Sequence, residues 1–189
     1  TNASLPIHQP VMVDEVVKGL AVRPGGSYVD GTVGLGGHAF AILKAAQPGG
    51  KLIGIDRDRH ALEHAAKRLS SYGDAAVLSY GNYKNAKDIC DEHAIETIDG
   101  LLLDLGVSSL QLSQPGRGFS FRRNEPLDMR MDGDQNLTAA EIINESEENE
   151  LADIIWKYGE ERRSRRIAKA IVADRPLSTT GELTGVIEQ

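Results

Sequence analysis

Three aspartates each follow an apolar segment, where a carboxylate could face a bound ligand. Asp30 ends residues 27–30, Asp56 ends the segment KLIGID, and Asp104 lies in LLLDLGVSS. Because ligands of open parallel sheets bind outside the carboxyl ends of the strands, we expect these three carboxylates to share one sheet edge. Such an edge would attract a cationic ligand.

A glycine-rich turn, VDGTVGLGGH at residues 29–38, would let a ligand approach the backbone closely. Gly34-x-Gly36-x-x-Ala39 also fits the dinucleotide-binding fingerprint. Asp30 would repel a pyrophosphate but could hold the cationic groups of S-adenosyl-L-methionine, which has no phosphate. The turn therefore favours S-adenosyl-L-methionine, and a tight turn without a ligand is the alternative.

Asp56 and Tyr83 suggest an adenosine-containing cofactor. A carboxylate at the tip of the second strand suits the hydroxyls of a ribose, and Tyr83 could stack on an adenine or be a core aromatic residue. Asp56 would serve NAD and S-adenosyl-L-methionine equally well. An NAD-type oxidoreductase thus stays open as an alternative, although the sequence offers no evident partner for hydride transfer.

The segment RGFSFRRNEPLDMRMD, residues 117–132, mixes arginines with Phe119 and Phe121. Arginine and aromatic side chains together hold phosphates and stack on bases. Arg117 and Arg130 are therefore candidate contacts to a nucleic acid. The alternative is an ordered loop that packs its own aromatic rings.

A second basic group lies further along the chain, at Arg162, Arg163, Arg165, Arg166 and Lys169. It is either a nucleic-acid contact or a solvated surface.

The elements that would position these residues alternate along the first half of the chain. Strands are expected at 27–30, 51–56, 75–79 and 98–105, and helices at 11–20, 38–46, 59–70 and 83–93. This alternation predicts an α/β fold with a parallel sheet. The near-continuous apolar run at 98–105 predicts a central strand that is covered on both faces.

The alternation stops near residue 105. Residues 108–136 are expected to form an ordered loop, and helices are expected at 139–144, from 146 to Gly159, at 160–173 and from Thr179 onward. Thr138-x-x-Glu141 and Thr179-x-x-Glu182 are capping-box patterns. We therefore predict an α/β domain at residues 1–106, followed by a loop and a helical domain at 107–189.

The composition excludes several classes of protein. The net charge of −7 argues against nucleic-acid binding through global charge alone, and no apolar run reaches the ~20 residues that span a bilayer. The first residues do not resemble a signal peptide. The single cysteine, Cys90, excludes an intramolecular disulfide framework and favours a cytoplasmic location. No spacing of metal ligands is seen, so we expect no required metal.

Several segments resemble one family, the bacterial 16S ribosomal RNA (cytosine-N4)-methyltransferases, RsmH (MraW). The matching segments are HQPVMVDEV, VDGTVGLGGH, IGIDRD, DGLLLDLGVSSLQL, RGFSF, PLDMRMD and YGEERRSRRIAKAI. RGFSF followed by PLDMRMD is highly specific to this family. One departure is Glu125, where the family usually has glycine.

The resemblance implies a class I, Rossmann-like methyltransferase fold with an inserted helical domain. It also implies S-adenosyl-L-methionine as methyl donor and, as acceptor, a cytidine in the decoding region of 16S rRNA in the small ribosomal subunit. Carried over by position, the cofactor contacts are Gly36, Gly37, His38, Asp56, Tyr83, Asp104 and Gln111. We add Asp30 and Gly34 from the turn itself.

The chemistry implied is methyl transfer to the exocyclic N4 amine of cytosine. We expect Asp104 to accept a hydrogen bond from this amine, with Ser108 or Ser109 in support. Phe119 or Phe121 would sandwich the extruded base. Arg117, Arg130, Arg162 and Arg166 would hold the RNA.

The family's chains are longer and return to the sheet after the helical insertion. This chain stops at Gln189, so we expect an incomplete sheet that lacks the last strands of the fold, and weak or absent turnover by the chain alone. A non-catalytic module that binds RNA during ribosome assembly is a further alternative. The sequence leaves open whether the protein is a homodimer.

Overall fold

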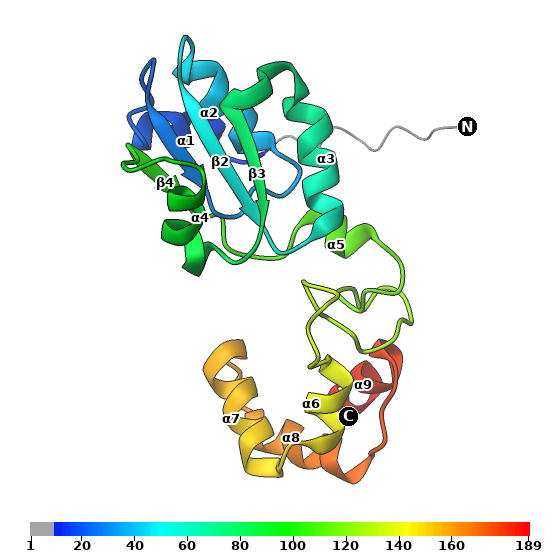
Figure 1. Cartoon of the computed structure of the whole chain (residues 1–189). Helices are drawn as coiled ribbons and strands as arrows, with labels where there is room; N and C mark the ends of the chain where they lie inside the picture. The colour runs from blue at the N-terminus through cyan, green and yellow to red at the C-terminus, as the bar shows by residue number, and fades with distance from the viewer. Residues whose placement is uncertain (1–9) are drawn as a thin grey trace, which may run out of the picture. The chain divides into compact units, whose positions relative to one another are not determined.

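The computed structural model describes residues 10–189, apart from the side chains of Ser109 and Leu110 (Figure 1). The beginning of the segment HQPVMVDEV, His8 and Gln9, lies outside the described residues. The chain divides into two compact units, Thr1–Gly106 and Val107–Gln189.

The first unit is built on a parallel four-stranded sheet. Its strands are β1 (Ser27–Asp30), β2 (Lys51–Asp56), β3 (Ala76–Tyr80) and β4 (Gly100–Leu102). All the pairings are parallel and the order is β3-β2-β1-β4 (Figure 1). This order is the first part of the Rossmann arrangement, so the predicted α/β, Rossmann-like class is confirmed.

A helix precedes the first strand, and further helices connect the strands. These helices are α1 (Val13–Gly19), α2 (Gly37–Ala46), α3 (Arg59–Leu69) and α4 (Ala86–Glu92), with two short 3₁₀ helices, η1 (Ser70–Ala75) and η2 (Tyr83–Asn85). Each predicted helix of this unit is present, with ends shifted by a few residues. Among the described residues, no helix has both the length and the apolar character needed to cross a membrane.

Alternate residues of β1 and β2 serve the two faces of the sheet. Tyr28 and Leu52 pack with Ile42 and Leu43 of α2 on one face. On the other face, Val29, Ile53 and Ile55 pack with Ile89 and Cys90 of α4. Each large side chain buried in this way contributes about 1.5–3 kcal/mol, so the ends of β1 and β2 are held on a rigid support.

The prediction of a central strand at 98–105 is wrong for the described part of the chain. The strand is limited to β4, which lies at an edge of the sheet. Leu101 is 44% exposed and Leu105 is 65% exposed. The apolar run predicted that these residues are buried. Among the described residues, however, no strand pairs with the outer side of β4.

The second unit consists of helices and of a long loop between the first two of them. Its helices are α5 (Ser109–Ser113), α6 (Ala139–Glu145), α7 (Glu148–Gly159), α8 (Ser164–Ala173) and α9 (Thr180–Ile187). Both predicted capping boxes are confirmed, at the starts of α6 and α9. Leu127, Leu151, Ala168, Ile171 and Val186 lie in one buried cluster.

The predicted end of α7 at Gly159 is confirmed, and Glu160 takes the left-handed conformation that follows it, with φ 52°. The expectation for the next helix needs correction. The helix predicted from residue 160 begins only at Ser164. Residues 160–163 are used to redirect the chain so that α8 packs against α7, and helical periodicity alone does not reveal such a turn.

Candidate functional site

The turn between β1 and α2 is anchored to two strands. The Gly31 N–H donates to the Leu102 carbonyl at 2.9 Å, and the Val33 N–H donates to the Ile55 carbonyl at 3.0 Å. Gly36 has φ 75°, and an added Cβ would lie 3.2 Å from the Cα of Ala65 in α3. The left-handed backbone and this close approach together explain why glycine is required here.

Asp56 holds the same turn from the end of β2. Its Oδ2 accepts the Gly34 N–H at 2.8 Å and its Oδ1 accepts the Asp58 N–H at 2.9 Å. Burial raises the pKa of Asp56, and these hydrogen bonds from the backbone oppose the rise. Each carboxylate oxygen has a second lone pair, which could accept a hydroxyl from a ligand.

Asp30, at the end of β1, is only 1% exposed. Its Oδ1 accepts the Thr32 N–H at 3.2 Å. Burial raises the pKa of Asp30 to about 7, and the nearby carboxylates of Asp56 and Asp104 add to the rise. Asp56 and Asp104 therefore each lie close enough to Asp30 to act on its charge, at the edge where the strand pattern indicated that the three would meet.

Asp104 follows β4 and is held by its backbone. Its N–H donates to Thr32 Oγ1 at 2.7 Å, while its side chain is 69% exposed. One carboxylate oxygen, Oδ2, lies 3.7 Å from Nε2 of His38 in the first turn of α2. The Asp104 backbone is thus fixed beside the turn, while its carboxylate is open to solvent and faces His38.

His38 faces Asp104 without a hydrogen bond between them, because Nε2 and Oδ2 are 3.7 Å apart. Burial lowers the pKa of its imidazole, which the Asp104 carboxylate partly opposes. Nδ1 is buried and has no hydrogen-bond partner among the described residues. Because a carboxylate only accepts, the proton of the neutral ring belongs on Nε2, and Nδ1 is left as a bare lone pair.

Tyr83 and Gly37 complete the predicted cofactor contacts of the first unit. Tyr83 is 39% exposed, and a Cβ on Gly31 would lie 2.9 Å from its Cβ, so Tyr83 stands beside the turn rather than in the core. An added Cβ on Gly37 would come within 2.8 Å of the Pro10 ring. The backbone at Gly37 therefore packs closely against the start of the described chain.

Ser108 and Gln111 cap α5. The Ser108 N–H donates to Gln111 Oε1 at 2.9 Å, and the Gln111 N–H donates to Ser108 Oγ at 3.1 Å. This Ser-x-x-Gln capping box is a local signal that the sequence analysis missed. Asp104 belongs to the first unit and these residues to the second, so their grouping in one site stays a prediction, and the side chain of Ser109 is not described.

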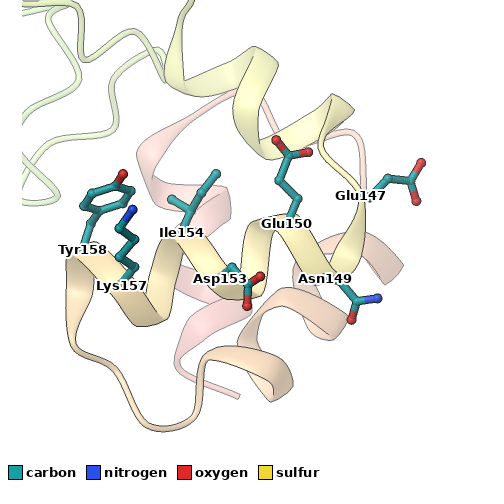
Figure 2. Close-up of a pocket in the computed structure, with 7 residues that line it drawn as sticks. All are labelled: Glu147, Asn149, Glu150, Asp153, Ile154, Lys157 and Tyr158. Carbon is teal, nitrogen blue, oxygen red and sulfur yellow. The ribbon is translucent and has the colours of Figure 1, made fainter.

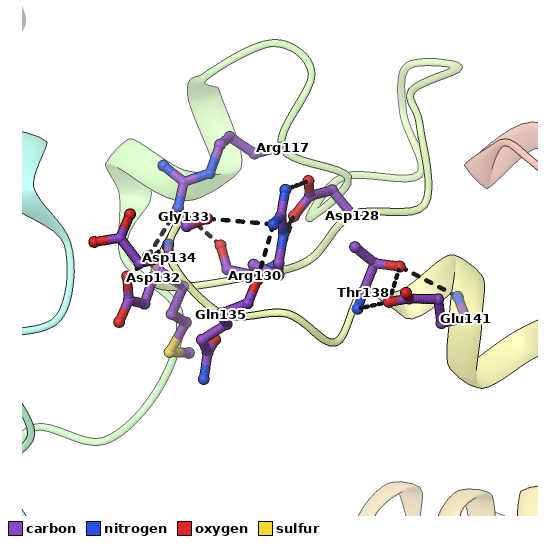
Figure 3. Close-up of polar contacts among 10 residues, drawn as sticks. Arg117, Asp128, Arg130, Asp132, Gly133, Asp134, Gln135, Thr138 and Glu141 are labelled. Carbon is purple, nitrogen blue, oxygen red and sulfur yellow. Dashed lines mark hydrogen bonds and ion pairs between the residues drawn. The ribbon is translucent and has the colours of Figure 1, made fainter.

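The predicted RNA contacts Arg117 and Arg130 hold the loop's own backbone (Figure 3). Arg117 donates to the carbonyls of Arg130 and Met131, at 3.0 and 3.1 Å. Arg130 forms an ion pair with Asp128 at 2.7 Å, lowers the pKa of that carboxyl, and donates to two further carbonyls. Much of the donor capacity of both guanidinium groups is therefore used within the loop.

Phe119 and Phe121 differ in their surroundings. The Arg117 guanidinium lies 5.8 Å from the centre of the Phe119 ring, which is half-buried. Phe121 is 78% exposed. Of these two rings, Phe121 is the more accessible to a base.

Glu125 is an anchor of the loop. It is 5% exposed and accepts the Gly118 N–H at 3.1 Å and Arg123 Nε at 2.8 Å. Its backbone exchanges hydrogen bonds with Thr180 of α9. Arg123 also donates to the carbonyls of Leu112 and Ser113, at the end of α5. A glutamate at this position therefore ties the loop to helices at both of its ends.

A hollow of about 570 Å³ lies away from these residues, along α7 (Figure 2). Glu147, Glu150 and Asp153 line it together with Tyr158. It lies in the helical unit and does not include the three aspartates. Among the described residues, no group of three or more potential metal ligands is found.

Comparisons with known proteins point to one family. The family described as "MraW methylase family" matches residues 6–189. A Dehalococcoides mccartyi protein named Ribosomal RNA small subunit methyltransferase H is 52% identical over 182 residues, which are 96% of this chain and 52% of that protein. Proteins of the same name from Syntrophotalea carbinolica and Brevibacillus brevis are 51% and 50% identical, over 95% and 96% of this chain and 58% and 59% of their own lengths. The chain thus spans about half the length of the curated relatives it matches.

The pKa of Asp30 makes a prediction about stability. Because this pKa is raised from 3.8 to about 7 on folding, the stability linked to the protonated carboxyl is lost as the pH rises from about 4 to about 7. Asp30→Asn does not titrate, so relative to the unsubstituted chain it should gain about 2–3 kcal/mol between pH 5 and pH 8. Urea unfolding at the two pH values measures this change.

Asp99→Asn is the matched control for this experiment. Arg23 holds the pKa of Asp99 below its usual value, so this carboxyl is ionised at both pH values, and Asp99→Asn should leave the stability difference between pH 5 and pH 8 unchanged. If Asp30→Asn and the unsubstituted chain differ in stability by the same amount at pH 5 and at pH 8, that result would contradict the burial of an ionisable Asp30.

Glu125→Ala should destabilise the helical unit by about 2–3 kcal/mol, because the Gly118 N–H and Arg123 Nε lose their acceptor. Glu125→Gln keeps the size and one acceptor and should cost less. Glu145→Ala, at an exposed site in α6, is the control and should change stability by about 0.5 kcal/mol or less. Equal unfolding midpoints for Glu125→Ala and Glu145→Ala would show that Glu125 is not an anchor.

Proposed function

The chain belongs to the MraW methylase family, as its motifs predicted, and on this premise we propose that it forms much of an S-adenosyl-L-methionine-dependent ribosomal RNA methyltransferase. The acceptor is the exocyclic N4 amine of a cytidine in the decoding region of the 16S rRNA of the small ribosomal subunit, which places the protein in the cytoplasm. Residues 1–106, together with Gln111, would hold the cofactor, and the rest of residues 107–189 would contact the RNA.

The observation that carries this proposal is the buried Asp30 carboxylate beside Asp56 and Asp104. S-adenosyl-L-methionine brings two positive groups and no phosphate, which would relieve the repulsion among these carboxylates. NAD brings a pyrophosphate, which would add to it, so an oxidoreductase is not favoured. The proposed cofactor contacts are Asp30, Gly34, Gly36, Gly37, His38, Asp56, Tyr83, Asp104 and Gln111.

The residues of the chain would divide the binding of the cofactor among them. Asp56 would accept the ribose hydroxyls through its remaining lone pairs, and the exposed Tyr83 would stack on the adenine. The glycine turn would let the methionine part approach the backbone. When bound, S-adenosyl-L-methionine supplies an electrophilic methyl group.

Asp104 would act on the amine that attacks. The lone pair of the cytosine amine is delocalised into the ring, and an acceptor for one N–H favours the pyramidal, nucleophilic form. After the nitrogen–carbon bond has formed, the amine carries an extra proton, which the Asp104 carboxylate would take. His38, whose Nε2 lies 3.7 Å from Oδ2 of Asp104, would face this carboxylate, and Ser108 or Ser109 would support the amine.

The base must leave its stack to reach the methyl group. Phe121, which is 78% exposed, would stack on it, with Phe119 as the other candidate. Arg117 and Arg130 would hold the loop that presents these rings and use their remaining N–H groups for the RNA. Arg162 and Arg166, which are both exposed, would contact phosphates.

The test is methyl transfer to unmethylated small subunits from labelled S-adenosyl-L-methionine, with the modified nucleotide mapped by mass spectrometry. In a chain extended to the length of the relatives, we expect label on N4 of one cytidine. Asp104→Ala should lower the rate about a hundredfold or more, in the range of general acid–base catalysis, and should change cofactor affinity much less.

Asp91→Asn is the control, because Asp91 is exposed and pairs with Lys87 in α4. It should leave both the rate and the affinity unchanged. Equal losses of affinity and rate in Asp104→Ala would contradict its catalytic role. Thermal stabilisation by NAD but not by S-adenosyl-L-methionine would contradict the proposed function itself, and RNA binding without any transfer would favour a non-catalytic module.

A further inference from the structure

A run of five basic residues surrounds the start of α8. All five side chains are exposed, and they are Arg162, Arg163, Arg165, Arg166 and Lys169. We call this set the α8 basic face. It stands out in a chain whose net charge is −7.

The α8 basic face has no acidic partners among the described residues. Elsewhere in the molecule, arginines form ion pairs: Arg23 with Asp99, Arg123 with Glu125 and Arg130 with Asp128. In the α8 basic face, the nearest equivalent is a hydrogen bond of 3.2 Å from Arg166 to the Gln189 carbonyl. Glu160 and Glu161 precede the run, and the Glu161 carboxylate accepts the backbone N–H of Arg163 at 2.7 Å, but none of the five side chains forms an ion pair in the described part of the chain.

The position of these basic side chains is unfavourable for the helix itself, and the one acidic group bonded to its N-cap residue Arg163 is the Glu161 carboxylate that precedes the helix. The N-terminus of a helix carries partial positive charge and favours acids. The first turns of α6, α7 and α9 contain acids, whereas that of α8 contains none. Within α8, Arg165 and Lys169 are like charges four positions apart, which costs about 0.2–0.5 kcal/mol.

Packing does not require the α8 basic face. Ser164, Ala168 and Ile171 are the buried residues of α8, and the latter two belong to the core of the unit. Sequences break local rules of this kind mainly where function demands it. A bound polyanion would remove both the repulsion among the side chains and the unfavourable interaction with the helix terminus.

The chemistry of the surroundings favours RNA as that polyanion. Four of the five residues are arginines, whose planar groups suit phosphate oxygens. Trp156 and Tyr158, in the last turn of α7 just before this run, are 55% and 74% exposed. Exposed aromatic rings beside arginines are typical of surfaces that bind single-stranded nucleic acid.

We propose that the α8 basic face binds the phosphodiester backbone of RNA without reading its sequence, whereas Arg117, Arg123 and Arg130 mainly hold the protein's own loop. The proposal rests on the proposed function in taking RNA as the partner, but it does not require methyl transfer. It assigns the salt-dependent part of RNA binding to one helix.

The test measures binding of the full 189-residue chain to a mixed-sequence single-stranded RNA oligonucleotide over a range of salt concentrations. Fluorescence anisotropy gives Kd at each concentration. The triple variant R162Q/R165Q/R166Q should bind more weakly, and its plot of log Kd against log salt should be flatter by about 2, because each lost phosphate contact removes about 0.7 from the slope.

The control K18Q/K44Q/K51Q makes the same change in net charge at exposed sites of the first unit. It should leave the slope nearly unchanged. The melting temperature gives a second readout. A structural role would lower it in the triple arginine variant, whereas we expect it to be unchanged or raised, since like charges are removed.

The outcomes separate this proposal from the proposed function. RNA binding that keeps its slope in the triple arginine variant would overturn the α8 proposal and leave the methyltransferase proposal intact. Salt-dependent RNA binding that needs these arginines, without methyl transfer by the extended chain, would support the α8 proposal and overturn the methyltransferase proposal. If RNA does not bind, or if sedimentation shows that the variant loses only self-association, the partner is not RNA and the α8 proposal is wrong.

Discussion

Burial of the Asp30 carboxylate beside two other carboxylates is the constraint on which the proposed cofactor site depends. Desolvation and repulsion both disfavour its charged form. The first unit tolerates this because Asp30 ends a strand in a well-packed sheet and receives the Thr32 N–H. In the proposed function, a positively charged ligand would favour the ionised form of Asp30.

The same backbone turn links the members of that site. Asp56 accepts from Gly34, and Thr32 accepts from the Asp104 N–H. Residues from three strand ends are thereby fixed relative to one another before any ligand is present. His38 extends this arrangement, because its neutral ring is buried on one side and faces the Asp104 carboxylate on the other. Such preorganisation reduces the cost of positioning groups at the moment of reaction.

Arginines have two different uses in the helical unit. In the loop, Arg117, Arg123 and Arg130 satisfy backbone carbonyls that no regular element pairs, which allows a long segment with little secondary structure to keep one conformation. In the α8 basic face, the guanidinium groups are exposed and have no acidic partners among the described residues. Proximity of arginine to aromatic residues in a sequence therefore does not by itself identify a contact to RNA. An arginine that holds the loop finds hydrogen-bond acceptors within the protein, whereas the side chains of the α8 basic face form no ion pairs with acids of the described chain.

The sequence by itself determined the family, the parallel α/β pattern, the ends of β1 and β2, both Thr-x-x-Glu capping boxes and the meeting of three aspartates at one edge. These features follow from local periodicity, from helix caps a few residues long, and from the rule that parallel strands end on the same side of their sheet. Only the tertiary structure decided that Asp30 is buried with a pKa near 7, that Glu125 and Arg130 are anchors, and that β4 lies at an edge of the described sheet. Burial and charge pairing depend on residues that are distant in sequence and converge only in the folded chain, so no local pattern could predict them.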